Sequence, residues 1–160
     1  ALNDTTFEAW RKQKYGEELT SVEAELLSRH AAWLAEFLAA DKIVFVNPMY
    51  NHFLPAELKQ YLDLTAVAHK TFKYTEKGAV GLLKGKKEMH IQAAGGLYHG
   101  EGIKPTLPDL GSIYLDNTMK FYGIDNINSV YIEGVDADPT KRDDIVNAAM
   151  NEAEKKAKEF

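Results

Sequence analysis

The chain of 160 residues contains no cysteine, and this absence removes several kinds of chemistry at once. Disulfide bonds, thiolate metal sites and cysteine nucleophiles are all excluded. A cysteine-free composition fits a reducing compartment, so we expect a cytoplasmic protein. The length corresponds to one domain, and 45% hydrophobic residues are enough to form a core.

Other features that the sequence lacks narrow the function further. No apolar run approaches the roughly 18–20 residues that span a bilayer, so we expect no membrane partner. The 19 basic residues are outnumbered by 24 acidic ones, and no basic stripe is interleaved with aromatics, which argues against a nucleic-acid partner. None of the five histidines has metal-ligand spacing, so we expect no metal site. Neither a phosphate-loop motif nor a Ser-His-Asp elbow occurs.

The most informative segment that is present reads KIVFVNPMYN and begins at Lys42. Its apolar run Ile43–Val46 predicts a strand buried on both faces, as in a parallel sheet covered by helices. In open α/β sheets, ligands bind just beyond the carboxyl ends of such strands. Met49, Tyr50 and Asn51 follow the strand and offer an apolar, an aromatic and an amide side chain. This combination suits a flat heteroaromatic ring.

Helices and strands alternate along the rest of the chain. A capping box at Thr20–Glu23 predicts a helix that runs to about Ala40. The expected elements after it are a strand over 43–46, a helix over 55–68, a hairpin or ordered loop over 71–78, a strand over 86–93, a helix over 112–122 closed by Gly123, a strand over 129–133 and a last helix from Asp138-Pro139. This order predicts an α/β fold: an open parallel sheet with helices on both faces.

A series of motifs in one order carries a resemblance to a known family. The motifs are NPMYN at 47–51, LPAELKQYLD at 54–63, KTFKYTEKGAVGLLKGKK at 70–87, HIQAAGG at 90–96 and YIEG at 131–134. They resemble the FMN-dependent NADH:quinone oxidoreductases, also called azoreductases. The resemblance implies a flavodoxin-like fold with strand order 2-1-3-4-5.

The same resemblance concerns the extent of the domain. The strands of this chain correspond to strands 3, 4 and 5, and the first two strands and the helix between them have no counterpart. We therefore expect residues 1–160 to form a single flavodoxin-like domain that is N-terminally incomplete. The strand at Ile43–Val46 is then left at the edge of the sheet.

The resemblance also implies that two loops bind FMN. The first loop contributes Pro48, Met49, Tyr50, Asn51 and His52, and the second contributes Ala93, Ala94, Gly95 and Gly96. The two glycines would let the backbone approach the pyrimidine edge of the flavin closely. Members of the family often have Ser and then Arg or Asn where this chain has Ala93-Ala94, so two side-chain hydrogen bonds are lost here. His52 either lines the pocket or is an incidental surface imidazole.

No side chain is expected to be catalytic, because in this family the flavin carries the chemistry. NADH or NADPH would reduce FMN, and a quinone or an azo compound would then take two electrons in a ping-pong reaction. Phe72 and Tyr74 either form an aromatic wall of the substrate pocket, contributed across a homodimer interface, or are ordinary packing residues. Two other interpretations stay open: a flavodoxin-type electron carrier and a flavin-free binding module.

Overall fold

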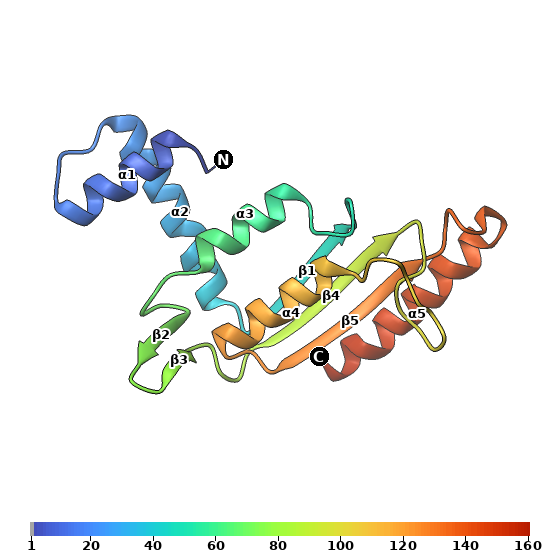
Figure 1. Ribbon diagram of the computed structural model, residues 1–160. Coiled ribbons are helices and arrows are strands. Elements are labelled where there is room, and N and C mark those ends of the chain that lie inside the picture. The colour runs from blue at the N-terminus through green and yellow to red at the C-terminus, as the bar shows by residue number, and fades with distance from the viewer. Residues whose placement is uncertain (1) are drawn as a thin grey trace.

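The computed structural model describes residues 2–160, and its centre is a parallel sheet (Figure 1). The sheet consists of β1 (Lys42–Pro48), β4 (Lys87–Ala94) and β5 (Asn126–Glu133), hydrogen-bonded in the order β1-β4-β5. Ile43 lies opposite Glu88, and Pro48 lies opposite Ala93. The predicted parallel α/β sheet is therefore confirmed, and its central strand is β4.

Strand β1 forms one edge of the described sheet, as expected, but it is not buried on both faces. Its residues alternate, with Ile43 and Phe45 buried while Val44 and Val46 are 50% and 71% exposed. The prediction that β1 is buried on both faces was wrong, because an apolar run indicates only that its residues tolerate burial. It does not state which elements cover each face.

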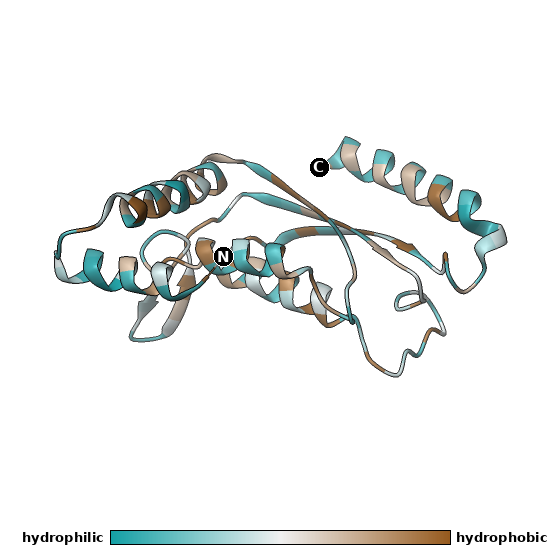
Figure 2. Ribbon diagram, turned by 90° about the horizontal axis from the view of Figure 1, so that it is seen from above, coloured by the Kyte–Doolittle hydropathy of each residue, from teal (hydrophilic) through white to brown (hydrophobic). Residues whose placement is uncertain are grey.

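The two faces of the sheet carry different helices (Figure 2). Helices α3 (Ala56–Thr65) and α4 (Leu110–Tyr122) pack on the face that holds Ile43 and Phe45. Helix α5 (Arg142–Glu159) follows the short 3-10 helix η1 (Pro139–Lys141) and packs against β5 from the other side. Lys156 of α5 donates to the backbone carbonyl of Ser129 in β5.

The hydrophobic core lies between β1, α3, α4 and the end of α2 (Ser21–Ala39). Phe37 packs edge-on against Tyr122, with ring centroids 6.0 Å apart. The Tyr122 hydroxyl is satisfied within the core, because it contacts Thr65 Oγ1 at 3.1 Å and donates to the carbonyl of Leu62. Burial of that hydroxyl raises the pKa of Tyr122 to about 12.

Two helices form a hairpin that projects from one end of the sheet (Figure 1). The second of them, α2, begins with the predicted capping box: Thr20 accepts from the backbone of Glu23, and Glu23 accepts from the backbone of Thr20. The first, α1 (Asp4–Tyr15), was not predicted. No helix of the described chain is long and apolar enough to cross a membrane.

The segment that was expected to be a hairpin or an ordered loop is a hairpin. It pairs β2 (Phe72–Thr75) with β3 (Gly78–Gly81) in antiparallel register. The backbone of Gly81 lies so close to the end of α4 that a Cβ there would stand 2.2 Å from the amide nitrogen of Gly123. This contact fixes the hairpin at the carboxyl end of α4. The hairpin therefore lies near the amino end of strand β4, away from the loops that follow β1 and β4.

Candidate functional site

The loop that follows β1 makes a tight two-residue turn at Asn51 and His52. Both residues have positive φ, 49° and 63°, and the flanking residues Tyr50 and Phe53 exchange two backbone hydrogen bonds of 2.9 and 3.0 Å. Asn adopts this left-handed region more readily than most residues. Within residues 2–160 no acceptor faces the backbone N–H groups of Asn51 and His52, and Tyr50 is 59% exposed. The turn therefore presents two free donors and an exposed aromatic ring.

The second expected loop lies beside the first. The backbone N–H of Met49 donates to the carbonyl of Ala93 at 2.7 Å. Pro48 and Ala93 are also opposite each other in the register of β1 and β4. The structure thus brings the two sets of predicted site residues together at the carboxyl ends of adjacent parallel strands, which is where α/β sheets bind ligands.

The two glycines of the second loop have different structural roles. A Cβ on Gly95 would stand 2.0 Å from Oδ2 of Asp136, so this glycine leaves room for the Asp136 side chain. A Cβ on Gly96 would meet only the ring of Tyr98, at an ordinary 3.4 Å. Gly96 is therefore the glycine whose surroundings leave space for a ligand.

The amino end of α4 and the segment after Gly96 complete the rim around the first loop. Gly111 N donates to the carbonyl of His52 at 3.3 Å, and its lack of a side chain lets α4 approach the backbone of Leu54. The Tyr98 hydroxyl contacts His52 Nδ1 at 3.2 Å, with the two rings edge to face. His52 therefore connects the first loop to the segment that follows the second.

Beneath both loops lies a group of buried polar side chains that the sequence did not reveal as a site. We call it the polar ring; its members are Asn47, His90, Gln92, Asp109 and Ser112. The signal that could have found it is the alternation of polar residues on β4, a central strand on which apolar residues are expected.

The members of the polar ring are joined end to end. Asn47 Oδ1 contacts His90 Nε2 at 2.9 Å, and His90 Nδ1 contacts Ser112 Oγ at 3.2 Å. Ser112 Oγ lies 2.9 Å from Asp109 Oδ2, which also accepts from Gln92 Nε2. Gln92 Oε1 closes the ring by accepting from Asn47 Nδ2 at 3.4 Å.

Outside the polar ring, His99 is held by two contacts of its own. Its ring stacks on Tyr131 with centroids 3.6 Å apart and planes 6° apart. His99 Nδ1 lies 2.7 Å from a carboxylate oxygen of Glu133, whose other oxygen accepts from the backbone of Tyr98 and His99. One carboxylate at the end of β5 thus orders the segment beyond Gly96.

The structure does not bring Phe72 and Tyr74 to these loops within one chain. Both lie on the β2–β3 hairpin, at the opposite end of α4, and 13 residues of helix span about 20 Å. Phe72 is buried and packs on Phe121 at 4.5 Å, so in this chain it is a core residue. Tyr74 is 72% exposed.

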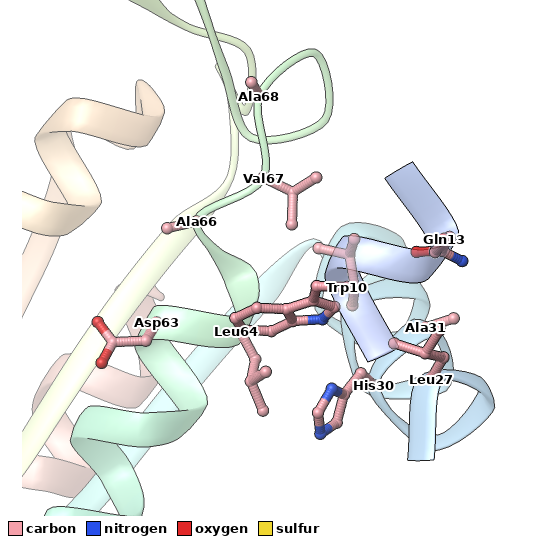
Figure 3. Close-up of a pocket in the computed structure, with 11 residues that line it drawn as sticks. Trp10, Gln13, Leu27, His30, Ala31, Asp63, Leu64, Ala66, Val67 and Ala68 are labelled. Carbon is pink, nitrogen blue, oxygen red and sulfur yellow. The ribbon is translucent and has the colours of Figure 1, made fainter. Parts of the chain in front are cut away.

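A separate cavity of about 470 Å³ lies between α1, α2 and the carboxyl end of α3 (Figure 3). The side chains of Trp10, His30 and Leu64 lie close to one another there (Figure 3). It contains none of the expected site residues. Among residues 2–160 there is also no cluster of three or more His, Cys, Asp or Glu that could hold a metal ion.

Comparison with known proteins decides the family. A family model described as "Flavodoxin-like fold" matches residues 1–157. The FMN-dependent NADH:quinone oxidoreductase 2 of Lactiplantibacillus plantarum is 68% identical over 160 residues, which cover 100% of this chain and 76% of that protein. The chain belongs to the flavodoxin-like family of FMN-dependent NADH:quinone oxidoreductases. A second member, FMN-dependent NADH:quinone oxidoreductase 1 of Lactococcus lactis, is 49% identical and is covered over 77% of its length.

Solved structures of the family confirm the flavodoxin-like fold. An FMN-dependent NADH-azoreductase from Bacillus anthracis, solved in complex with FMN, superposes with a TM-score of 0.86 at 34% identity. The superposition covers 99% of this chain and 74% of that one. A second azoreductase from Bacillus anthracis gives a TM-score of 0.84 at 36% identity and is covered over 76% of its length.

Proposed function

We propose that this protein is an FMN-dependent oxidoreductase that transfers two electrons from NADH or NADPH to quinones and azo compounds. The observation that carries the proposal is the Met49–Ala93 hydrogen bond, which joins the two candidate loops at the carboxyl ends of β1 and β4. Support also comes from the names of the relatives, which are NADH:quinone oxidoreductases and an azoreductase with bound FMN.

The residues at this place fit an isoalloxazine ring. The first loop, Pro48–His52, offers two unpaired backbone N–H donors and the side-chain amide of Asn51 to the polar edge of the ring. Met49 and Tyr50 offer polarisable contact area, and Gly96 leaves space for close approach of the backbone. Ala93 and Ala94 contribute through their backbone only.

The two loops would hold FMN, which would supply the two-electron redox chemistry between the nicotinamide and the acceptor that replaces it. The chain itself has to orient the ring and keep one of its faces open. The turn at Asn51 and His52 holds the donors in place through the Tyr50–Phe53 hydrogen bonds. The hydrogen bond between Tyr98 and His52 restrains the opposite side of the same turn.

We further propose that the working unit is a homodimer. Tyr74 is exposed at the far end of α4, so it can contribute to a substrate pocket only from a second copy of the chain. In a two-fold arrangement, each subunit would place its hairpin over the flavin of the other. Phe72, buried beneath Tyr74 with ring centroids 5.4 Å apart, would support that ring from below.

An FMN titration tests the function. Purified protein mixed with FMN should quench flavin fluorescence with a saturating endpoint of one FMN per chain, and NADH or NADPH should then bleach the visible spectrum without another protein. A flavin that binds but is not bleached by either nucleotide would favour the electron carrier. No binding at excess FMN would favour the flavin-free module, and either result would refute the enzyme.

Light scattering tests the dimer. A monomer at micromolar concentration that retains full quinone reductase activity would rule out the shared site. The prediction is a dimer whose activity is lost on dilution in parallel with its mass.

A further inference from the structure

The side chains of the polar ring are buried, so their hydrogen-bond donors and acceptors have to be matched by one another. The five side chains of Asn47, His90, Gln92, Asp109 and Ser112 are each at most 6% exposed. Every one of them has a ring neighbour on both sides. Buried donors and acceptors that face each other must be matched, because an unmatched pair costs free energy.

The direction of the hydrogen bonds is fixed at Asn47. Its Nδ2 lies 2.9 Å from the backbone carbonyl of Pro48, which can only accept. The amide oxygen of Asn47 must then face His90, so His90 Nε2 must carry a proton and donate. Asn47 Nδ2 also donates to Gln92, so the amide oxygen of Gln92 must face Asn47. The amide nitrogen Nε2 of Gln92 then faces the carboxyl group of Asp109 and donates to it.

On the Nδ1 side of the His90 ring, the available protons are too few for the contacts. A neutral His90 that donates from Nε2 can only accept at Nδ1, so the single hydroxyl proton of Ser112 points to His90. The 2.9 Å contact between Ser112 Oγ and Asp109 Oδ2 is then left with two acceptors and no proton if Asp109 is ionised. With neutral His90 and ionised Asp109, the ring is one proton short.

We propose that the polar ring holds one additional proton, shared along Asp109, Ser112 and His90, and that the completed ring positions the two candidate FMN loops. With this proton, each of the five contacts has one donor and one acceptor: all five run in the same direction around the ring when the proton is on Asp109, and the two contacts of Ser112 are reversed when it is on His90. The ring then holds the first loop through Asn47 and Pro48, and the second through Gln92, which precedes Ala93. The second half of the proposal rests on the proposed function.

The surroundings disfavour the His90 end of the ring as the place of the proton. Burial lowers the pKa of His90 to about 4, although Asp109 opposes this effect. The other titratable groups that face the ring are Asp116 on α4, Tyr131 on β5 with its ring 6.4 Å from that of His90, and His99, whose Nε2 lies 3.8 Å from Asp109 Oδ2; Glu88, on the same strand, faces Asp116. His99 is partly exposed and lies between Asp109 and solvent.

Infrared spectroscopy of the flavin-free protein at pH 7 tests the proton directly. The difference spectrum between wild type and Asp109→Asn should contain the carbonyl band of a buried protonated carboxyl group. Ser112→Ala, which removes the partner of that proton, should shift the same band. Glu88→Gln is the matched control, because it removes a different buried carboxyl group and should leave the Asp109 band in place.

Nitrogen NMR of His90 in the wild type completes the test without a variant. A neutral ring protonated at Nε2, together with the Asp109 band, supports the proposal, and so does an imidazolium, which places the extra proton on His90. Neutral His90 with no carboxyl band that responds to Asp109→Asn or Ser112→Ala would overturn it. Because these measurements need no flavin, they are decided even if FMN does not bind.

The positioning role is tested by FMN affinity. Ser112→Ala should weaken FMN binding by about tenfold, a loss of one matched contact. Ser112→Thr, which keeps the hydroxyl, should restore the affinity, and Glu88→Gln should stay within about twofold of wild type. Unchanged affinity in Ser112→Ala would refute the positioning role, whereas failure of the wild type to bind FMN would refute the proposed function instead.

Discussion

The two halves of the interface between β4 and α4 differ in whether their buried polar groups have hydrogen-bond partners. In the carboxyl half, His90 and Gln92 of the strand face Ser112 and Asp109 of the helix, and each side chain has partners. In the amino half, Glu88 faces Asp116. Neither oxygen of Glu88 nor Oδ1 of Asp116 has a hydrogen-bond partner within residues 2–160.

The difference shows how one strand and one helix can serve two purposes. Matched polar groups in a medium of low dielectric fix a single arrangement, which suits the end of the sheet that carries both loops. Unmatched carboxyl groups resist ionisation instead: burial, with the nearby Asp116, raises the pKa of Glu88 to about 8, and burial also raises the pKa of Asp116. The amino half therefore makes stability depend on pH.

The largest expected effect comes from breaking the matched half. Gln92→Leu should lower the free energy of unfolding by about 2–4 kcal/mol, because the amide of Asn47 and the carboxyl group of Asp109 both lose a buried partner. Denaturant unfolding at pH 7 measures the loss. Glu88→Gln, on the same face of the same strand, is the control and should not lower stability at that pH, because it removes a carboxyl group whose raised pKa already costs stability there; a loss equal to that of Gln92→Leu would contradict the comparison.

The next effect is the pH dependence of the unmatched half. The folded protein binds more protons than the unfolded chain at Glu88 between pH 4.5 and about 8, so stability falls as pH rises through that range. His90 acts in the opposite direction between about pH 4 and 6.5, because its folded-state pKa is lowered. The two effects offset each other in part below pH 6.5.

Above that pH His90 no longer offsets the effect of Glu88. We expect wild type to lose about 2 kcal/mol between pH 6.5 and 8, and Glu88→Gln to remove most of this slope. Unfolding curves at a series of pH values measure it. A flat wild-type profile over this range would mean that Glu88 titrates near its ordinary pKa.

A smaller effect is expected at the loop above the matched half. Asn51→Ala should weaken FMN binding by about 0.5–1.5 kcal/mol through loss of one hydrogen bond. Because Asn51 has a φ of 49°, Asn51→Gly should be compared with it, since glycine removes the amide without straining the turn. Fluorescence titration measures both. An FMN affinity and a flavin reduction rate equal to wild type in Asn51→Gly would remove this side chain from the site.

The smallest effect on stability is expected at the hairpin beside the unmatched half. Tyr74→Ala should change the free energy of unfolding by less than about 0.5 kcal/mol, because the side chain is largely exposed. It should nevertheless lower kcat/KM for a quinone while FMN affinity stays constant. Tyr15→Ala on α1, also exposed, is the control. Parallel kinetics in the two variants would argue against a shared pocket.

Local signals in the sequence predicted much of the fold. The capping box at Thr20 and the glycine after Tyr122 marked helix ends that the structure confirms, because both are set by contacts within one turn. Helix α1 was missed, although Asn3 and Gly16 cap it. Only Thr6 and Ala9 of its 12 residues are buried, so the sequence has no apolar periodicity that predicts this helix.

The polar ring could not be predicted for a different reason. Its contacts between elements join residues that are 17 to 45 positions apart in the chain. Nothing local indicates that Asn47, at the end of an apolar run, would face His90 of another strand. The two loops, in contrast, follow their strands directly, so the place of the expected site was predicted from strand ends alone.

The open edge of β1 affects how solution measurements on this protein have to be interpreted. Its outer backbone groups are unpaired in the described sheet, and Val44 and Val46 lie exposed beside them. Such an edge is a template for pairing with the same strand of another molecule, and this pairing grows with concentration and temperature. A dimer joined in this way would have the same mass as the proposed catalytic dimer but would leave Tyr74 free in solvent. Val46→Lys, which places a charge on the edge without touching the hairpin, separates the two kinds of association.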